Sequence, residues 1–334
     1  SYRLNPSDLS ESMGNGSFYA AVSELSGSSN QWWIISTGTV QNISRAIELK
    51  PVLTAEIGYA LMSLAGDSKL DKDGFIDDDV YSFGKITVNG RSSPTINGEV
   101  QALDTRNLDY TPLTSDDKVE MDLLAPIADF AAASGSAPTY IDVEYPPGSG
   151  ITNTYVDLTD GKVVKVGANY TLNKLSDPEG TYGDGTLIVD GDLKFGNGLA
   201  NDFVIGDGAH VYVNGDIVLQ KDGTFGAGVV VYSTGNMSLD KAAGSDSTTF
   251  LVEGNLTVDK DLDFNGLIFA EGSVTVAGDM NLNGSLIAGD GFWLKGGYNV
   301  AYDDSQIPDY VLDNMIVYVT YSAKPGSWTE VPVL

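Results

Sequence analysis

The sequence comprises 334 residues, of which 42% are hydrophobic, 39 are glycine and none is cysteine. This length allows a large core with two or three structural regions, and the lack of cysteine excludes disulfides and thiolate-bound metals. The formal net charge of −28 opposes binding to nucleic acid or to anionic lipid headgroups. No uninterrupted apolar run reaches the roughly 18 residues of a membrane-spanning helix.

Residues 1–57 are predicted to form a small β module. The chain starts at Ser1 with neither an initiator Met nor a signal peptide, so we expect a processed chain or a fragment. Three apolar-rich segments, 18–25, 32–40 and 43–49, are separated by short turns. This spacing is typical of an antiparallel meander.

Residues 58–103 are predicted to hold an acidic loop followed by the first solenoid strands, which begin near residue 82. The loop contains Asp71, Asp73, Gly74, Ile76 and Asp77 at the spacing of the middle of an EF-hand loop. Lys69 and Val80 stand where an EF-hand has its first and last ligands, so Asp67 or Asp79 would substitute. The candidate Ca²⁺ ligands are Asp67, Asp71, Asp73, Asp77 and Asp79. The alternative is a solvated acidic loop without metal.

Residues 104–150 are predicted to interrupt the solenoid with one short helix and a linker. Ser115 can cap a helix whose first turn carries Asp116 and Asp117, where the helix dipole favours acids. Leu123, Ile127 and Phe130 would then share one face.

A repeated phrase of apolar residues, a turn with Gly and Asp, Asn or Glu, and further alternating apolar residues dominates the region 151–300. Its turn glycines, at positions 191, 215, 235, 254, 272 and 291, are 24, 20, 19, 18 and 19 residues apart. We expect these glycines to supply the positive φ of tight corners. Because one such unit cannot bury its apolar face alone, the repeats predict a right-handed parallel β-solenoid. The alternative is an antiparallel sandwich, which also has short, evenly spaced strands.

Residues 301–334 lie beyond the last repeat. The segments 316–321 and 326–331 have strand patterns. We expect them to cap the solenoid or to return to the N-terminal module.

Acidic residues in the solenoid could in principle form the paired carboxylates of a carbohydrate-active enzyme. Asp259, Asp261 and Asp263 alternate and could share a strand face, as could Asp190 and Asp192. However, no residue stands out as a general base with a paired acid, and arginine is absent from 151–300. We therefore expect no enzyme activity, no catalytic residue and no organic cofactor. The acidity itself is explained by solubility, with cation binding outside a cell as the alternative.

Other candidate groups are few. The single histidine, His210, is expected at the surface, and the glycines of 223–228 fit solenoid corners better than a phosphate loop because no helix follows. Trp32, Trp33, Trp293 and Trp328 could form a sugar platform. We expect core packing for most of them, and a solenoid cap for Phe292 with Trp293.

Five segments in the same order resemble one family. They are Trp33–Val40, Ser44–Glu48, Pro126–Phe130, Gly185–Leu193 and Ser327–Glu330. Together they are similar to large minor pilins of type IV pili, the PilX-like and ComZ-like class. In that class a β-solenoid is inserted into, or carried on, a small pilin-like antiparallel sheet.

The resemblance implies an exported, cell-surface protein that a hydrophobic N-terminal helix would hold in a type IV pilus. That helix, its processing site and its usual glutamate are missing here, so contact with a membrane would depend on the missing segment. The implied partners are other pilin subunits, with a surface polymer or glycan as ligand for adhesion. Three alternatives remain open: a DNA-uptake receptor pilin, which the net charge disfavours, a polysaccharide-active β-helix enzyme, and a bactofilin-like self-assembling scaffold.

Overall fold

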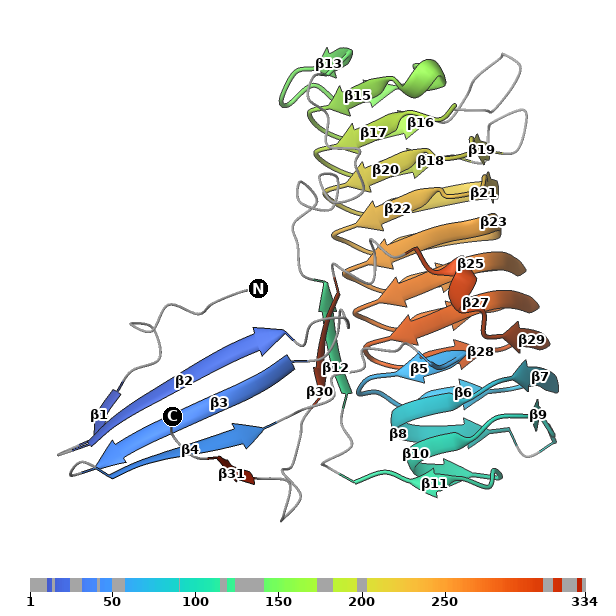
Figure 1. Ribbon diagram of the computed structural model, residues 1–334. Coiled ribbons are helices and arrows are strands. Elements are labelled where there is room, and N and C mark those ends of the chain that lie inside the picture. The colour runs from blue at the N-terminus through green and yellow to red at the C-terminus, as the bar shows by residue number, and fades with distance from the viewer. Residues whose placement is uncertain are drawn as a thin grey trace. The chain divides into compact units, whose positions relative to one another are not determined.

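The computed structural model describes residues 58–89, 91–114, 141–172, 183–196 and 203–308 with their side chains (Figure 1). Outside these ranges it describes the backbone of the strands within 11–49, 119–123, 315–319 and 329–331. The chain divides into two compact units, a sheet unit (Ser1–Glu56 with Val319–Leu334) and a solenoid unit (Ile57–Tyr318).

The sheet unit contains a five-stranded antiparallel sheet in the order β1-β2-β3-β4-β31. Its strands are β1 (Glu11–Met13), β2 (Gly16–Glu24), β3 (Trp32–Val40), β4 (Ile43–Leu49) and β31 (Thr329–Val331). The meander predicted for the N-terminal module is therefore confirmed. The last strand returns to this sheet, where Thr329 pairs with Glu48.

The solenoid unit is a parallel β-solenoid of about ten turns, as the repeated phrase predicted. One group of its strands comprises β5 (Leu61–Ser63), β6 (Ser68–Leu70), β7 (Gly74–Asp77), β8 (Val80–Val88), β9 (Thr95–Ile96), β10 (Val100–Arg106) and β11 (Thr111–Pro112). The other group comprises β13 (Val143–Tyr145), β14 (Ile151–Thr152), β15 (Val163–Val166), β16 (Tyr170–Leu172), β17 (Thr186–Val189), β18 (Leu193–Phe195), β19 (Phe203–Ile205), β20 (His210–Val213), β21 (Ile217–Phe225), β22 (Val230–Ser233), β23 (Met237–Val252), β24 (Leu256–Val258), β25 (Leu262–Ala270), β26 (Val274–Val276), β27 (Met280–Ala288), β28 (Phe292–Leu294) and β29 (Tyr298–Ala301). Single 3-10 turns, η3 (Thr159–Gly161) and η4 (Asp304–Gln306), complete the described elements.

Each turn has three short strands. In the turn that starts at His210, β20 is the first strand, and the two ends of β21, Ile217–Leu219 and Gly223–Phe225, serve as the second and third strands. The next turn begins at Val230, the register partner of His210. Apolar residues at equivalent positions of successive turns therefore stack on one another and form ladders. One buried ladder of the first strands is Leu187, Val211, Val231, Phe250 and Ile268.

The first strands bury their outward side chains as well. The outward ladder is Tyr212, Tyr232, Leu251, Phe269, Ile287, Met62 and Tyr81, which belong to a second apolar cluster. Ile307 lies in the same cluster, and Tyr59 and Tyr302 pack against it. Burial on both faces explains why these strands read as nearly continuous apolar runs.

The repeat glycines are required by close stacking more than by unusual backbone angles. Of the six, only Gly291 has a positive φ, at 104°. A Cβ on Gly254 would lie 2.6 Å from the carbonyl oxygen of Gly235, and a Cβ on Gly272 would lie 2.8 Å from that of Gly254. The expectation of positive φ at these corners was therefore wrong for all but Gly291. Glycine is required at these corners because the stacked backbone leaves no room for a side chain.

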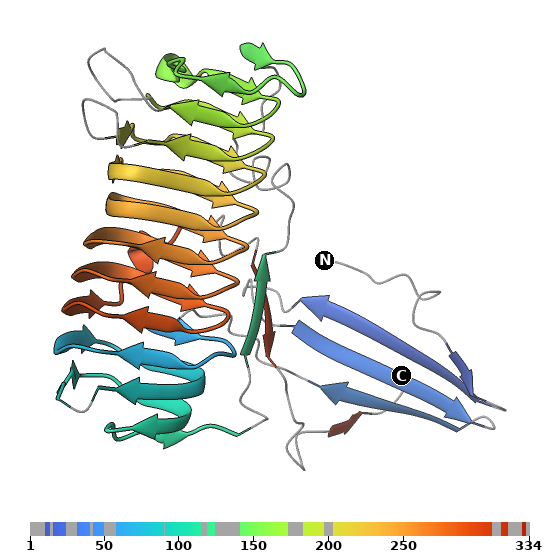
Figure 2. The ribbon, with the colours of Figure 1, turned by 180° about the vertical axis from the view of Figure 1, so that it is seen from behind.

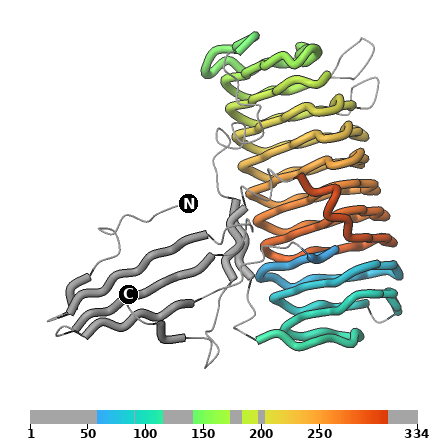
Figure 3. The backbone as a smooth tube through the Cα atoms, viewed as in Figure 1, coloured from blue at the N-terminus to red at the C-terminus, as the bar shows by residue number. Residues whose placement is uncertain are grey.

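The order of turns along the stack differs from their order in the sequence. β27, the last long strand, pairs with β5, while β28 pairs with β6 and β29 with β7. The turns of residues 61–112 thus continue the stack below those of residues 143–301, which is visible from both sides (Figures 1 and 2). In Figure 3 the red turns are followed directly by the blue ones. We call this junction of β27–β29 with β5–β7 the seam.

Two predicted segments fold otherwise than expected. Residues 119–123, assigned to a helix, form strand β12 (Val119–Leu123), which pairs with β30 (Met315–Val319). The alternation of Val119, Met121 and Leu123 with acids is a strand signal that the helix prediction overlooked. The rest of the predicted helix, from residue 124 on, lies outside the described residues.

The acidic segment 67–79 forms part of a solenoid turn instead of a loop. It contains β6 and β7, whose Leu70 and Ile76 are fully buried in the core. The solenoid strands therefore start at Leu61 and not near residue 82, and β10, β11 and β13 extend them into the region predicted as an insertion. Within the described residues, no helix is long and apolar enough to cross a membrane.

Candidate functional site

The five carboxylates predicted to bind Ca²⁺ accept hydrogen bonds at separate points of one turn. Their donors are the amide of Lys85 to Asp67 (2.9 Å), Nε1 of Trp293 to Asp71 (2.7 Å), the amide of Ser93 to Asp73 (2.6 Å), Nδ2 of Asn97 to Asp77 (2.8 Å) and the amide of Glu99 to Asp79 (2.6 Å). No three His, Cys, Asp or Glu side chains gather as a possible metal site anywhere in the described part of the chain. The structure thus does not bring these carboxylates together.

Two series of corner carboxylates and amides connect successive turns by hydrogen bonds. Oδ1 of Asp192 accepts from the amide of Asp216 (3.0 Å), whose own Oδ1 accepts from the amide of Asn236 (2.7 Å). Asn236 and Asn255 continue this corner ladder to Ser273. A second ladder runs from Asp261 to Asp279 and on to Gly297. Because each side-chain oxygen satisfies a backbone N–H of the next turn, the aspartates of these ladders have a structural role.

The acids considered for glycan hydrolysis do not form a common face. Asp261 and Asp192 belong to the corner ladders, and Asp190 forms an ion pair with Lys165 at 3.1 Å. Asp263 is exposed on β25, while Asp259 is exposed in the turn after β24. These five residues therefore do not share one strand face.

His210 begins β20 and is partly buried, which lowers the pKa of its imidazole. Its ring stacks on Tyr212 at 6.0 Å. Gly226 and Gly228 lie at the corner before β22. This position agrees with the prediction that glycines of residues 223–228 form solenoid corners. Neither feature forms a ligand site.

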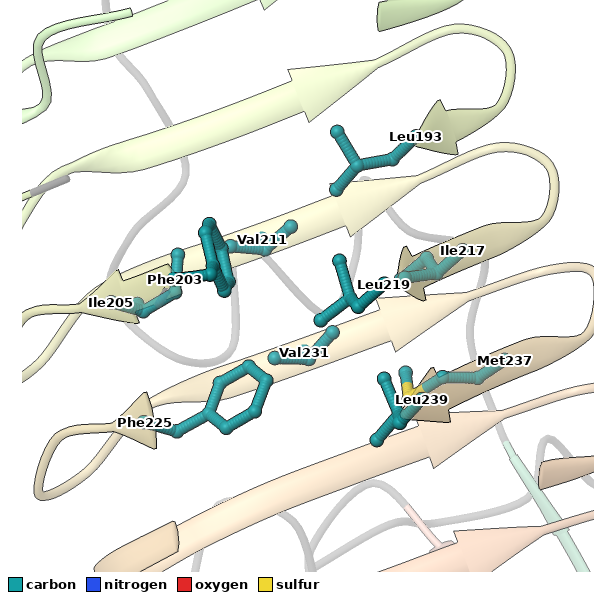
Figure 4. A pocket seen from close by; sticks show the side chains of 10 residues that line it. All are labelled: Leu193, Phe203, Ile205, Val211, Ile217, Leu219, Phe225, Val231, Met237 and Leu239. Carbon is teal, nitrogen blue, oxygen red and sulfur yellow. The ribbon is translucent and has the colours of Figure 1, made fainter. Parts of the chain in front are cut away.

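A small cavity lies in the solenoid interior between the turns of β18 and β23 (Figure 4). Its lining is entirely apolar: Leu193, Phe203, Ile205, Val211, Ile217, Leu219, Phe225, Val231, Met237 and Leu239. The cavity volume is about 10 Å³, barely room for one water, which would find no polar partner there. We therefore interpret it as a packing gap in the core.

Exposed aromatic side chains distinguish the seam from the rest of the solenoid wall. In the described residues, the exposed large hydrophobic side chains are Phe75, Leu103, Tyr110, Ile141, Val143, Tyr155 and Trp293. Tyr110, Ile141, Val143 and Tyr155 lie in the outermost described turns, and Leu103 lies on β10, next to the terminal strand β11. Phe75 and Trp293 are each 37% exposed and lie on adjacent turns of the seam.

Trp293 is held in a defined position. Its Nε1 donates to Oδ2 of Asp71 (2.7 Å), and its strand register partner is Lys69. The Nζ atoms of Lys69 and Lys295 lie 5.0 and 4.0 Å from the centroid of the indole ring. Both distances are within the range of cation–π attraction. We call Lys69, Asp71, Phe75, Trp293 and Lys295 the seam surface.

Four lysines of the solenoid form ion pairs, and Lys69 and Lys295 belong, with Lys72, Lys194, Lys221 and Lys241, to those for which the described residues show none. Lys85, Lys162, Lys165 and Lys260 each form an ion pair with an aspartate. Across the described residues, no carboxylate forms an ion pair with Lys69 or Lys295. The carboxylate of Asp71 accepts from the same indole, so the two lysines and this acid together leave one positive charge on the seam surface.

Phe292 and Trp293 were expected to act together as a cap of the solenoid. Instead, their side chains lie on opposite faces of β28. Phe292 is buried in the core at 1% exposure, whereas Trp293 points outward from the same strand. The signal that could have located it is the repeat itself. The equivalent position in earlier turns holds Lys194, Val218, Ser238, Thr257 and Thr275, none of which is buried in the core.

Comparisons with known proteins identify no family. No protein-family model matches the chain, and no curated protein matches it. Among solved structures, the chain is similar to the crystal structure of the competence-associated pilin ComZ from Thermus thermophilus, with a TM-score of 0.32 and 12% identity over 89% of this chain and 80% of that chain. A similarity at this level does not establish a shared fold or function.

Proposed function

We propose that the chain is a non-enzymatic, minor-pilin-like protein of the cell surface that displays its solenoid for adhesion at a type IV pilus. The sheet unit would associate with other pilin subunits, and the solenoid would contact a surface polymer or partner. The order of the family-like segments in the sequence supports the pilin assignment. The topology supports display.

The observation that carries the proposal is the place of the solenoid in the chain. Residues 57–318 separate β4 from β31, yet Glu48 of β4 pairs with Thr329 of β31 in one sheet. The chain thus leaves the sheet unit and returns to it on neighbouring strands. A module inserted in this way can be presented without breaking the sheet that carries it.

Within the solenoid unit, the entering and leaving segments both lie near the seam. The carbonyl of Tyr59 accepts a hydrogen bond from Oγ of Ser285 (2.8 Å), and Gln306 accepts from the amide of Ser247 (2.9 Å). The chain therefore enters and leaves the solenoid unit between its two end turns and not at either end. This arrangement suits presentation of a long, rigid surface.

The end turns argue against the self-assembling scaffold. β11 contains Pro112, and Pro146 and Pro147 directly follow β13. Asp109 and Glu144 are exposed at the same two ends. Proline and like charges on edge strands prevent edge-to-edge pairing, so solenoid ends of this kind do not favour stacking into filaments.

Localisation in the source cells tests the proposal. Antibodies against the solenoid should label intact cells, and the protein should co-purify with sheared pili. The surface label should disappear when pilus assembly is disrupted. A cytoplasmic marker serves as the control for cell integrity. Protein found only in the cytoplasmic fraction, or surface label that persists without pili, would contradict a pilus-associated role.

A further inference from the structure

We propose that the seam surface binds an acidic polysaccharide, whose uronate carboxylates contact Lys69 and Lys295 while a sugar ring packs on Trp293. This inference names the ligand class of the displayed solenoid and in that sense rests on the proposed function. It is argued from three properties of the surface: a positioned, partly exposed aromatic ring, two lysines that outnumber the one carboxylate beside them, and a polar row along the stack.

The aromatic component is preorganised. The only polar atom of the indole already donates to Asp71, and the ammonium groups of Lys69 and Lys295 lie over the ring. A sugar would therefore contact the apolar part of Trp293 that these groups leave exposed. Its strand is paired on both sides, with Thr275 in one neighbouring turn and Lys69 in the other. A ring held by its neighbours loses little conformational freedom on binding, which favours affinity. The C–H face of a sugar provides apolar contact of matching size.

The charge component selects an anion. The chain as a whole carries a formal charge of −28, which repels polyanions at long range. Against this background Lys69 and Lys295 stand over one ring and form no ion pair in the described residues. The neighbouring Lys72 is exposed and lies between Asp71 and Asp73. A ligand with one carboxylate per sugar can use these charges. The dense phosphates of DNA would experience more of the surrounding repulsion.

The polar component extends the surface beyond one sugar. On the second strands, the outward residues Thr257, Thr275, Trp293, Lys69 and Thr87 follow one another in register. Around the corner, Asn281, Asn299, Phe75 and Thr95 form a similar row on the third strands. Neighbouring strands lie roughly 4.8 Å apart, so hydroxyl and amide groups recur at a spacing that a polymer chain can follow.

The experiment measures binding of the purified full chain to polygalacturonate, by titration calorimetry and tryptophan fluorescence. The matched ligand is the methyl ester of the same polymer, which keeps the sugars and loses the charge. We expect saturable binding to polygalacturonate that weakens with salt, and roughly tenfold weaker binding to the ester.

Variants locate the site. Trp293→Ala and the double variant Lys69→Gln with Lys295→Gln should each weaken binding by roughly tenfold or more. Lys194→Gln is the matched control, because Lys194 is an exposed lysine at the equivalent outward position of an earlier turn, and its affinity should equal that of the wild type. Because the two lysines are surface residues, the double variant tests the site even if Trp293→Ala reduces stability.

Several outcomes would overturn the inference. These are equal affinity for the acid and its ester, tighter binding to single- or double-stranded DNA than to polygalacturonate, an equal effect of Lys194→Gln, or no binding to polygalacturonate. The assay uses purified protein and does not depend on where the protein lies in the cell. If the protein labels pili but does not bind polygalacturonate, the ligand is rejected and the proposed function stands. If it binds polygalacturonate but does not label pili, the pilus-associated function is rejected and the ligand stands.

Discussion

Leu61 and Leu286 are register partners in neighbouring parallel strands, although 225 residues separate them in the sequence. Both side chains are fully buried. The contact joins the turns of residues 61–112 to those of residues 143–301 in one continuous core. The continuity of the core therefore depends on a pairing between the two ends of the solenoid sequence.

Stacking at the seam should be sensitive to a single methyl group at Gly66. A Cβ there would lie 1.6 Å from the carbonyl oxygen of Asp290, so the two corners would have to separate. We expect Gly66→Ala to lower the free energy of unfolding by about 1–3 kcal/mol, measured by urea denaturation. Gly58→Ala is the control, since a Cβ at Gly58 meets nothing within 4 Å. Equal stability of the two variants would show that the seam is not packed as described.

The corner ladder should need an acceptor atom and not a negative charge. Asp216→Asn keeps an oxygen for the amide of Asn236, whereas Asp216→Ala leaves that N–H without its partner. We expect a loss of about 1 kcal/mol for alanine and a change within about 0.5 kcal/mol for asparagine. Chemical denaturation at two salt concentrations checks both. If asparagine destabilised as much as alanine, the charge itself would be required.

Acid should remove a contribution of Asp157 to stability. Side-chain hydrogen bonds from Lys162 and Thr159 lower the pKa of this carboxyl to about 2 from the ordinary 3.8. Because the folded value lies below the unfolded one, the stabilisation is complete above the ordinary pKa and is lost as pH falls from about 4 to about 2. Melting temperatures of Asp157→Asn should fall less steeply over this window than those of the wild type. Asp259→Asn, at an exposed acid in the turn after β24, should behave as the wild type does.

Calcium should have little specific effect on melting. Asp67, Asp73 and Asp79 each accept a backbone hydrogen bond from the following turn, so binding a cation with the same oxygens would compete with stacking. We expect no saturable rise of the melting temperature on titration with Ca²⁺ beyond that given by Mg²⁺ at equal ionic strength. A saturable rise that is lost in Asp71→Asn would restore the predicted calcium site.

The sequence by itself determined the stacked fold and the antiparallel meander. Both depend on local signals, namely glycine corners of near-constant spacing between apolar alternations, and strands joined by short turns. Gly254 and Gly272 are informative because every corner meets the corner of the turn before it, so the same residue type recurs at each. The three strands at 16–24, 32–40 and 43–49 pair with their nearest neighbours in the sequence.

The order of the turns and the character of the seam were decided only in the tertiary structure. All turns offer the same parallel backbone hydrogen bonds, so nothing local to Leu61 indicates that its partner is Leu286. For the same reason residues 67–79 appeared as an acidic loop, since the turn that covers Leu70 and Ile76 lies more than 200 residues away in the chain. The exposure of Trp293 between two lysines depends on Lys69 arriving from that distant turn. A single sequence shows which residues alternate, and the folded stack decides which of them become neighbours.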